Sequence, residues 1–488
     1  MIAAILLALT IAPALAVICC LLTRSPRMSE RINLAASIIA FASALPLPFI
    51  IGQTPKLFWD DYVLIDRAST WVILCTAIVY LLASIYAVGY MRLLKAEERL
   101  PTFYALFAGF AFTVLIGPLM NNIGIYWIAI ELTTLVSTFL VAFEREAESM
   151  EAAWKYIMVV SAGISLALLG TLLFYWNGSF VLGPTYRMTW GVLTDAAPKM
   201  NPVLITLSFL LVLVGYGTKV GLAPMHSWLP DAHSESPAPV SAMLSGALLN
   251  TAMIGIVRFL AITNAAHVGL VPQLALVAFG ALSLFIGALF IVRQPGIKRL
   301  MAYSSIEHMG VIALGFGFGG PLGIAGAFYH MLNHALNKSL MFFGAGNMMR
   351  AYGSKEIARI EGVSKYFPTL GGLWLGGAIA ITGAPPFGLF LSEFTIMRAG
   401  LKPFFSWAVY AMVVLLIVIF IGFMNHFRSM YYGQPNGAAV VPQTRPGAWC
   451  VAPMWMAFVP LLILGLWWPI GIWDYLISIA DALAPGVP

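Results

Sequence analysis

Charged side chains are scarce in this sequence, at only 9% of the 488 residues, whereas hydrophobic residues make up 61%. Soluble domains carry about 25% charged residues, so the composition excludes an ordinary water-soluble fold. No stretch of the chain is polar enough for a separate soluble domain. The mean hydropathy of +0.90 is typical of a membrane protein instead.

Cysteines and cofactor motifs are also scarce. The four cysteines lie in apolar surroundings without CxxC spacing or a matched histidine, which argues against a thiolate metal site or a redox pair. The glycine-rich run at residues 315–320 has no preceding strand, so it is not a nucleotide-binding loop. The sequence contains no recognisable nucleophile with a base, and we expect no cofactor in this chain.

Apolar stretches of about twenty residues recur from end to end, each long enough to cross a bilayer as a helix. They predict an all-α, polytopic membrane protein with about fourteen transmembrane helices. Helices 1–3 are expected in residues 1–100, helices 4–8 in 101–262, helices 9–13 in 271–430 and helix 14 in 448–488. The first run, Met1 to Leu22, lacks a basic leader segment and is expected to be a retained span rather than a cleaved signal.

Basic residues test this arrangement, because they collect in cytoplasmic loops. With the amino terminus outside, 17 of the 26 Lys and Arg residues fall in predicted cytoplasmic loops and 6 in outer loops. This bias predicts that both termini lie on the outer side of the cell (inner) membrane. It also accounts for the net charge of +6 without a nucleic-acid partner.

Two predicted spans, the seventh and the twelfth, are interrupted by Pro and Gly in GTKVGLAPMHSWLPDAH and ITGAPPFGLFLSEF. Such breaks free backbone polar groups, which hydrocarbon tolerates only where protein or a water-filled cavity satisfies them. Because the breaks are five spans apart, they predict two inverted five-helix repeats, each with a broken helix. The alternative is that each break is only a kink in a large bundle.

Ionisable residues inside predicted spans are the main functional signal, because charges at bilayer depth are costly and usually mark ion or proton paths. The chief candidates are Glu131, Lys219, His308, Lys338 and Glu393. Burial disfavours a charged lysine and a nearby carboxylate favours it, so movement of Glu131 relative to Lys219 would load or unload a proton. A static ion pair that fixes helix packing is the alternative.

His330, His334 and Lys338 stand at i, i+4 and i+8 and therefore share one helical face. We interpret this face as a proton relay. Zinc binding by the two histidines is one alternative, although the sequence shows no third ligand. A structural stripe of hydrogen-bonded polar residues is the other.

A secondary polar path is predicted along Lys155, His226, Asp231 and Asn250. His226 and Asp231, together with His233, have the donor types of a metal site. Polar residues are nevertheless ordinary at a membrane edge, and no metal site is predicted.

Four motifs carry a family resemblance: KVGLAPMHSWLPDAHSESPAPVSAMLSGALLN, which starts at Lys219, and then SSIEHMG, HALNKSLMFFGAGN and GAPPFGLFLSEF. Their order and spacing resemble the antiporter-like subunits of respiratory complex I, the Mrp-type cation/proton antiporters and the membrane-bound nickel-iron hydrogenases. Within this group the chain looks closest to component F of the hydrogenase-4 and formate hydrogenlyase type.

The resemblance implies a fourteen-helix core with inverted repeats and charged residues on helices five, seven, eleven and twelve. These positions fall on Glu131, Lys219, Lys338 and Glu393. Many relatives carry a bridging Lys or His on the eighth helix, where this chain has Asn250. Since Asn cannot carry a proton there, the link between the two halves is expected to use water or the histidines of the second half.

Together these features predict a proton-translocating, antiporter-like membrane subunit of a multisubunit oxidoreductase, either a membrane-bound hydrogenase or a complex I-like assembly. The resemblance implies other membrane-arm subunits and soluble redox partners, which would hold nickel-iron and iron-sulfur centres or flavin. Protons or Na⁺ are the expected ions. A stand-alone or Mrp-like Na⁺/H⁺ antiporter subunit and a non-pumping membrane anchor are the alternatives.

Overall fold

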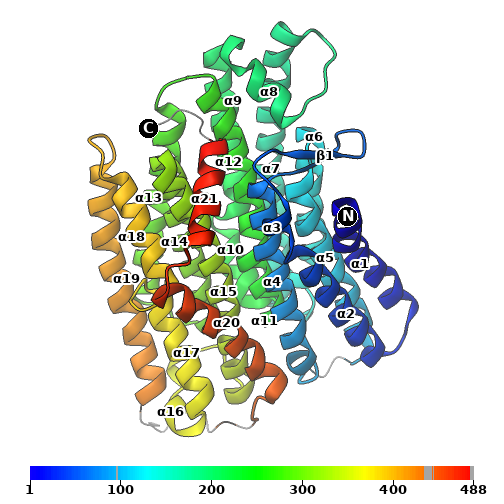
Figure 1. Ribbon diagram of the computed structural model, residues 1–488. Coiled ribbons are helices and arrows are strands. Elements are labelled where there is room, and N and C mark those ends of the chain that lie inside the picture. The colour runs from blue at the N-terminus through cyan, green and yellow to red at the C-terminus, as the bar shows by residue number, and fades with distance from the viewer. Residues whose placement is uncertain (95–96, 434–441, 443, 484–488) are drawn as a thin grey trace.

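The computed structural model describes residues 1–94, 97–433, 442 and 444–483. Lys95, one of the predicted cytoplasmic basic residues, and residues 484–488 of the predicted last segment lie outside the described residues. The described chain is almost entirely helical (Figure 1). Its one sheet pairs β1 (Lys56–Phe58) antiparallel to β2 (Val63–Ile65).

The α-helices are α1 (Ile2–Leu22), α2 (Pro26–Ala44), α3 (Leu47–Ile50), α4 (Arg67–Met91), α5 (Leu100–Ile116), α6 (Ile123–Val141), α7 (Ala147–Leu182), α8 (Trp190–Ala196), α9 (Pro202–Val220), α10 (Trp228–Glu235), α11 (Ala238–Met243), α12 (Leu249–Ala265), α13 (Val271–Ile291), α14 (Ile297–Phe318), α15 (Gly320–Tyr352), α16 (Val363–Tyr366), α17 (Pro368–Ile381), α18 (Gly388–Gly400), α19 (Ser406–Tyr432), α20 (Ala448–Leu466) and α21 (Ile470–Leu483). Short 3₁₀ turns are η1 (Glu97–Arg99), η2 (Gly117–Leu119), η3 (Ala197–Lys199) and η5 (Ile357–Arg359), and the π-helical turn η4 (Leu244–Leu248) joins α11 to α12.

Eleven helices in the described ranges are long and apolar enough to cross a membrane. The other three spans that the sequence predicts correspond to α14, α15 and the pair α17 and α18, which are helical but were not among these eleven. Polar residues on α14 and α15 are tolerated because both helices are buried almost throughout, with protein rather than lipid around them. The count of fourteen spans therefore stays a prediction.

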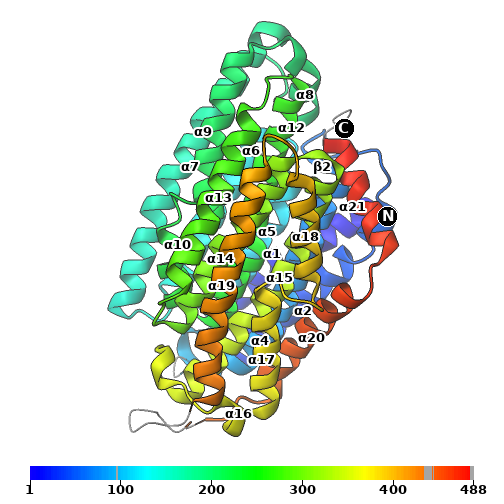
Figure 2. The same cartoon turned by 90° about the vertical axis from the view of Figure 1, so that its left-hand side faces the viewer.

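Central and peripheral helices differ sharply in burial. The most apolar window of the segment 238–265 is 100% buried, against 28% for α1 and 33% for α20, so the former lies inside the bundle and the latter two face outward. The pair α1 and α2 and the helix α19 lie at opposite sides of the molecule (Figures 1 and 2). The candidate proton-path residues thus lie mainly on helices that the rest of the bundle surrounds.

Charged loops gather at the two ends of the bundle, which carry α8 and α16 respectively (Figure 1). At the α16 end, Arg350 pairs with Glu144 at 2.9 Å and Lys355 pairs with Glu235 at 2.7 Å. At the α8 end, Arg187 pairs with acidic residues of the β1–β2 turn. The loops that the basic-residue count assigns to the cytoplasm therefore meet at one end.

Both predicted helix breaks are present. The first separates α9 from α10, and Gly221 ends α9 in the left-handed conformation with φ of +79°. The second separates α17 from α18, with Gly383 at φ of +65°. Asn201 starts α9 by accepting backbone hydrogen bonds with its side chain, as Asn122 does for α6. These caps and breaks fix where the charged residues of the two helices lie.

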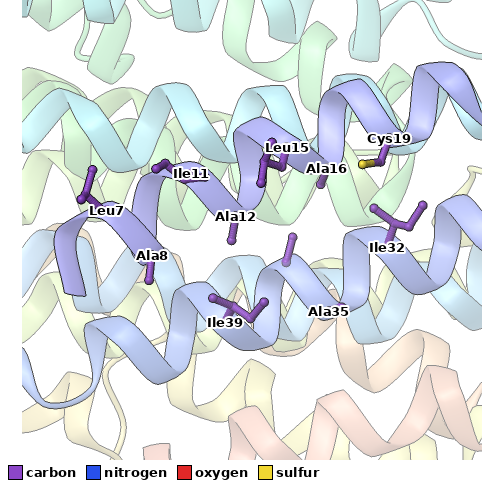
Figure 3. Close-up of a pocket in the computed structure, with 11 residues that line it drawn as sticks. Leu7, Ala8, Ile11, Ala12, Leu15, Ala16, Cys19, Ile32, Ala35 and Ile39 are labelled. Atoms are coloured by element: carbon purple, nitrogen blue, oxygen red, sulfur yellow. The ribbon is translucent and has the colours of Figure 1, made fainter. Parts of the chain in front are cut away.

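An apolar groove of about 420 Å³ lies between α1 and α2 (Figure 3). Its lining side chains are aliphatic apart from Cys19. Because it offers no charged or strongly polar group, this groove is not the functional site.

Candidate proton path

Lys219 lies in the last turn of α9, beside the first break, and is completely buried. Its ammonium donates hydrogen bonds to the hydroxyl of Thr134 at 2.9 Å and to that of Tyr156 at 2.8 Å. It also lies 5.1 Å from the centre of the Tyr156 ring. A buried ammonium is thus held by neutral oxygens from α6 and α7 rather than by a direct ion pair.

Glu131 lies on α6, one turn before Thr134. One carboxylate oxygen accepts from Ser161 at 2.7 Å and the other accepts from Thr134 at 3.3 Å. Thr134 therefore accepts from the lysine and donates to the glutamate, so a single hydroxyl joins the two charges. The sequence predicted the two charged residues but not Thr134, Tyr156 or Ser161. The position of Thr134 at i+3 from Glu131 was the one available signal.

Glu131 is only half-buried. Its helix neighbours Ile128 and Leu132 are 57% and 37% exposed, so the carboxylate lies at the edge of the outward face of α6. Within this chain, Lys219 is therefore fully buried and Glu131 only in part.

Small residues bring α7 and α9 close together. A Cβ at Gly163 would lie 2.5 Å from a side chain of α9, and one at Gly215 would lie 2.4 Å from the backbone of α7. Glycines at such positions allow helix backbones to approach in membrane proteins. This close packing places Tyr156 of α7 against Lys219 of α9.

A second buried lysine, Lys338, projects from α15 to α14. Its ammonium donates to the hydroxyl of Ser304 and to the carbonyl of Met301, the latter at 3.3 Å. Like Lys219, it has no carboxylate within 4.0 Å among the residues that the structure describes.

Three helices of the second half contribute to a chain of hydrogen-bonded groups. The Nδ1 of His308 lies 3.0 Å from the Nε2 of His330, and the Nδ1 of His330 lies 2.9 Å from the hydroxyl of Ser392. On the other side, His308 Nε2 lies 3.4 Å from a carboxylate oxygen of Glu307. Neutral imidazole donates through one nitrogen and accepts through the other, so this chain can carry a proton along its length.

Glu393 on α18 is 2% exposed, and its Oε1 has no hydrogen-bond partner in the described protein. A Cβ at Gly383 would lie 1.9 Å from its Oε2, so glycine in the break leaves room for this carboxylate. Its oxygens lie within 4.8 Å of ring nitrogens of His308 and His330. The second break therefore allows the buried Glu393 carboxylate to lie beside His308 and His330.

The zinc alternative concerns which histidines and carboxylates lie close enough to share an ion. Within the described ranges, the only group of three donors close enough to share an ion is His308, His330 and Glu393, not His330 with His334. Neither does His226 form such a group with Asp231 and His233. The pair His330 and His334 therefore still lacks a third ligand, and the group that does form comes from three different helices.

His334 and Asn250 lie near this chain but are not linked into it. The His334 ring centre is 5.5 Å from that of His308, and neither of its nitrogens has a protein partner. Asn250 follows the π-helical turn η4, and its amide donates to the carbonyls of Gly246 and Met331 at 3.1 and 3.4 Å. The predicted face of α15 is therefore divided, with His330 in the relay and His334 beside it.

The secondary residues lie nearer the α16 end. Lys155, whose side chain is 50% exposed, pairs with Asp231 at 3.3 Å, and Asp231 also contacts Arg299. His226 is half-buried. Lys298, which the sequence assigns to a cytoplasmic loop, is instead 3% exposed and donates to the carbonyls of Ser234 and Ser236, because α14 begins inside the bundle.

At the opposite end lies a cavity of about 640 Å³. Charged residues line it, including Asp61, Asp195 and the ion pair of Arg258 with Asp66 at 3.1 Å. Arg258 is therefore paired near the bundle end and does not join the central group.

The comparisons with known proteins agree with this geometry. Residues 120–422 match the family model described as NADH:quinone oxidoreductase/Mrp antiporter, TM. The Hydrogenase-4 component F homolog of Methylacidiphilum infernorum is 36% identical over 77% of this chain and 79% of its own length. NADH-quinone oxidoreductase subunit N of Desulforudis audaxviator is 28% identical over 89% of this chain and 86% of its own length.

Among solved structures, a chain of the archaeal membrane-bound sulfane sulfur reductase matches with a TM-score of 0.88 at 22% identity. The match covers 99% of this chain and 97% of that chain, which shows a common fold. The chain is an antiporter-like membrane protein, and it belongs to the NADH:quinone oxidoreductase/Mrp antiporter family.

Proposed function

We propose that this chain translocates protons as a membrane subunit of a multisubunit oxidoreductase. The observation that carries the proposal is the hydrogen-bonded connection from Glu131 through Thr134 to the buried Lys219, next to a broken helix. Residues of this kind at membrane depth are costly and are usually retained for ion or proton movement.

The first group, which consists of Glu131, Thr134 and Lys219, couples the charge of Lys219 to that of Glu131. The Lys219 ammonium is stabilised by two hydroxyls and by the Glu131 charge, which Thr134 relays. When Glu131 is neutralised or moves away, the buried ammonium loses its counter-charge and releases its proton more readily. A shift of α6 against α9 would therefore load and unload Lys219.

The second group, which consists of His308, His330 and Glu393, forms a path along which a proton can move. Each imidazole can accept a proton at one nitrogen and donate one from the other, and Glu393 supplies a carboxylate beside the pair. Several buried polar atoms of the central helices have no hydrogen-bond partner in the described protein, namely Asn250 Oδ1, both ring nitrogens of His233 and His334, Asn333 Oδ1 and Asn337 Oδ1. Buried polar groups need hydrogen-bond partners, which supports a hydrated connection.

The membrane arrangement that we propose has fourteen spans with two inverted five-helix repeats in residues 101–262 and 271–430. Its support is that the fourth predicted span of each set is broken, between α9 and α10 in the first and between α17 and α18 in the second. We further propose the cell (inner) membrane, with both termini on the outer side, from the basic-residue bias.

The outward face of α6 supports contact with another membrane subunit. A carboxylate facing lipid at that depth would be costly, so we propose that a neighbouring subunit covers Glu131. Soluble partners would hold the redox centres, which are nickel-iron and iron-sulfur clusters if the partner is a hydrogenase, or flavin in a complex I-like assembly. Conformational changes that accompany redox reactions in these partners would then drive proton movement through this chain.

Purification of the tagged chain from its native membrane tests the proposal. We expect it to co-purify with redox subunits, and vesicles containing the complex should acidify or alkalise upon turnover without added Na⁺. A chain that purifies alone and exchanges Na⁺ for H⁺ in liposomes would contradict the proposal. So would a complex whose turnover moves no ion, which is the behaviour of a membrane anchor.

A further inference from the structure

Glu307 is a buried acid that the sequence reading did not include in the path. It lies in the middle of α14, is completely buried, and neither carboxylate oxygen has a hydrogen-bond partner within the described chain. A Cβ at Gly287 of α13 would lie 2.7 Å from the Glu307 Cβ, so α13 packs closely against this position. An acid kept out of water without hydrogen bonds is costly and needs an explanation.

Glu307 shares one feature with Glu131, a hydroxyl one turn away that binds a buried lysine, although Ser304 makes no hydrogen bond to Glu307. In the first half, Lys219 donates to the hydroxyl three residues after Glu131 on the second helix of the proposed repeat. In the second half, Lys338 donates to the hydroxyl of Ser304, three residues before Glu307 on the corresponding helix. Each half thus has a glutamate and a hydroxyl one turn apart, with a buried lysine from another helix bound to the hydroxyl.

The position of Ser304 favours Glu307 over Glu393 as the partner of Lys338. Lys338 binds only neutral oxygen atoms directly, so its charge needs a carboxylate nearby. The hydroxyl that binds Lys338 belongs to Ser304, one turn before Glu307 on α14, whereas Glu393 lies on α18. The helices that pack against α14 are α10, α13, α15 and α18. Besides Glu307, the titratable residues of α14 and these helices are Lys298, Arg299, Tyr303 and His308 on α14, Asp231, His233 and Glu235 on α10, Tyr329, His330, His334, Lys338, Arg350 and Tyr352 on α15, and Glu393 and Arg398 on α18.

We propose that Glu307, Ser304 and Lys338 form a second proton-loading unit, in which Glu307 passes its proton to His308. This inference rests on the proposed function. The proton leaves the Glu307 carboxyl for His308 Nε2, which lies 3.4 Å away and has no hydrogen-bond partner in the described chain, once a small movement brings the two atoms within hydrogen-bond distance. His308 then releases its Nδ1 proton to His330 Nε2, so that one proton moves on, Glu307 is left as a carboxylate and no electron is transferred.

Glu307→Gln in the intact complex is the test, since glutamine keeps the size and loses the exchangeable proton. We expect turnover-driven proton uptake in vesicles to fall by at least about 100-fold, the usual contribution of a positioned proton carrier. Glu148→Gln is the matched control, because Glu148 is exposed at the start of α7 and should have no effect. Lys219→Ala is measured in parallel.

Infrared difference spectra separate a proton carrier from a packing residue. A protonated carboxylic acid gives a carbonyl band that shifts in D₂O, and we expect Glu307→Gln to remove one such band. Glu307→Asp keeps a carboxyl group and should recover part of the uptake, which keeps the test valid if the glutamine variant fails to assemble.

Full proton uptake by Glu307→Gln together with an inactive Lys219→Ala would overturn this inference alone. Full uptake by Lys219→Ala would overturn the proposed function. An unchanged carboxyl band, or no recovery in Glu307→Asp, would also count against Glu307 as a carrier.

Discussion

Removal of the hydroxyl that joins Glu131 to Lys219 is the sharpest local perturbation. Thr134→Val keeps the shape of the side chain and deletes the acceptor for Lys219 at 2.9 Å and the donor to Glu131 at 3.3 Å. Each charged group keeps one other partner, Tyr156 for the lysine and Ser161 for the glutamate. We therefore expect the complex to assemble while the link between the charges is lost.

The size of the effect follows from the bond that is lost. A hydrogen bond to a charged group contributes about 1.5–3 kcal/mol, and Lys219 is fully buried, so water outside the bundle does not replace it directly. If the whole loss falls on the proton-transfer step, the rate drops by about 10- to 150-fold, because about 1.4 kcal/mol corresponds to a factor of ten.

Proton uptake by vesicles, followed with a pH-sensitive dye during turnover, measures this rate, and a native gel reports assembly. Thr133→Val is the matched control, because the Thr133 hydroxyl is buried on the same helix but donates only to the Ile130 carbonyl at 2.6 Å. Thr134→Ser should restore most of the rate. Wild-type uptake by an assembled Thr134→Val complex would refute the bridging role.

Three further predictions concern the second half and the link between the halves. Gly383→Ala should destabilise the protein by about 1–3 kcal/mol and lower proton uptake, because the left-handed backbone and the Glu393 carboxylate leave no room for a Cβ. Gly372→Ala is the control, since a Cβ there would have no atom within 4 Å. Equal melting temperatures of the two variants would argue against this packing explanation. Chelators should leave proton uptake unchanged if the histidine chain is a relay, whereas a stoichiometric metal in this chain whose removal stops uptake would show a metal centre instead. Asn250→Leu should slow uptake by about 2- to 10-fold, the value of one neutral hydrogen bond, and an unaffected rate would place the link between the halves elsewhere.

The sequence predicted many of the helices because a membrane helix can be identified from the apolar residues of its own segment. Runs of apolar residues located the helices, and Pro and Gly located both breaks. The segments of α14, α15 and the pair α17 and α18 were also predicted as spans, although α14 and α15 carry buried polar residues and the break leaves α17 and α18 only 14 and 13 residues long. The burial of Lys298 at the start of α14 was not foreseen, since the sequence does not reveal which helices surround that residue.

The sequence named charged and imidazole residues of the candidate site but not the contacts between them. Helical spacing placed His330 and His334 on one face, yet the partners of His330 are His308 from α14 and Ser392 from α18. The sequence could not show that Thr134 joins Glu131 to Lys219, because this contact depends on the position of α9. Such contacts between helices distant in sequence depend on tertiary packing, which periodicity does not encode.

The proton-to-electron ratio of the reconstituted complex tests the central claim most directly. With Lys219→Ala, the ratio should fall by the protons that this chain carries, while electron transfer in the partner subunits continues. Lys219→Arg keeps a charge that cannot be released and should show the same loss. A ratio equal to that of the wild type in either assembled variant would contradict proton translocation through this chain.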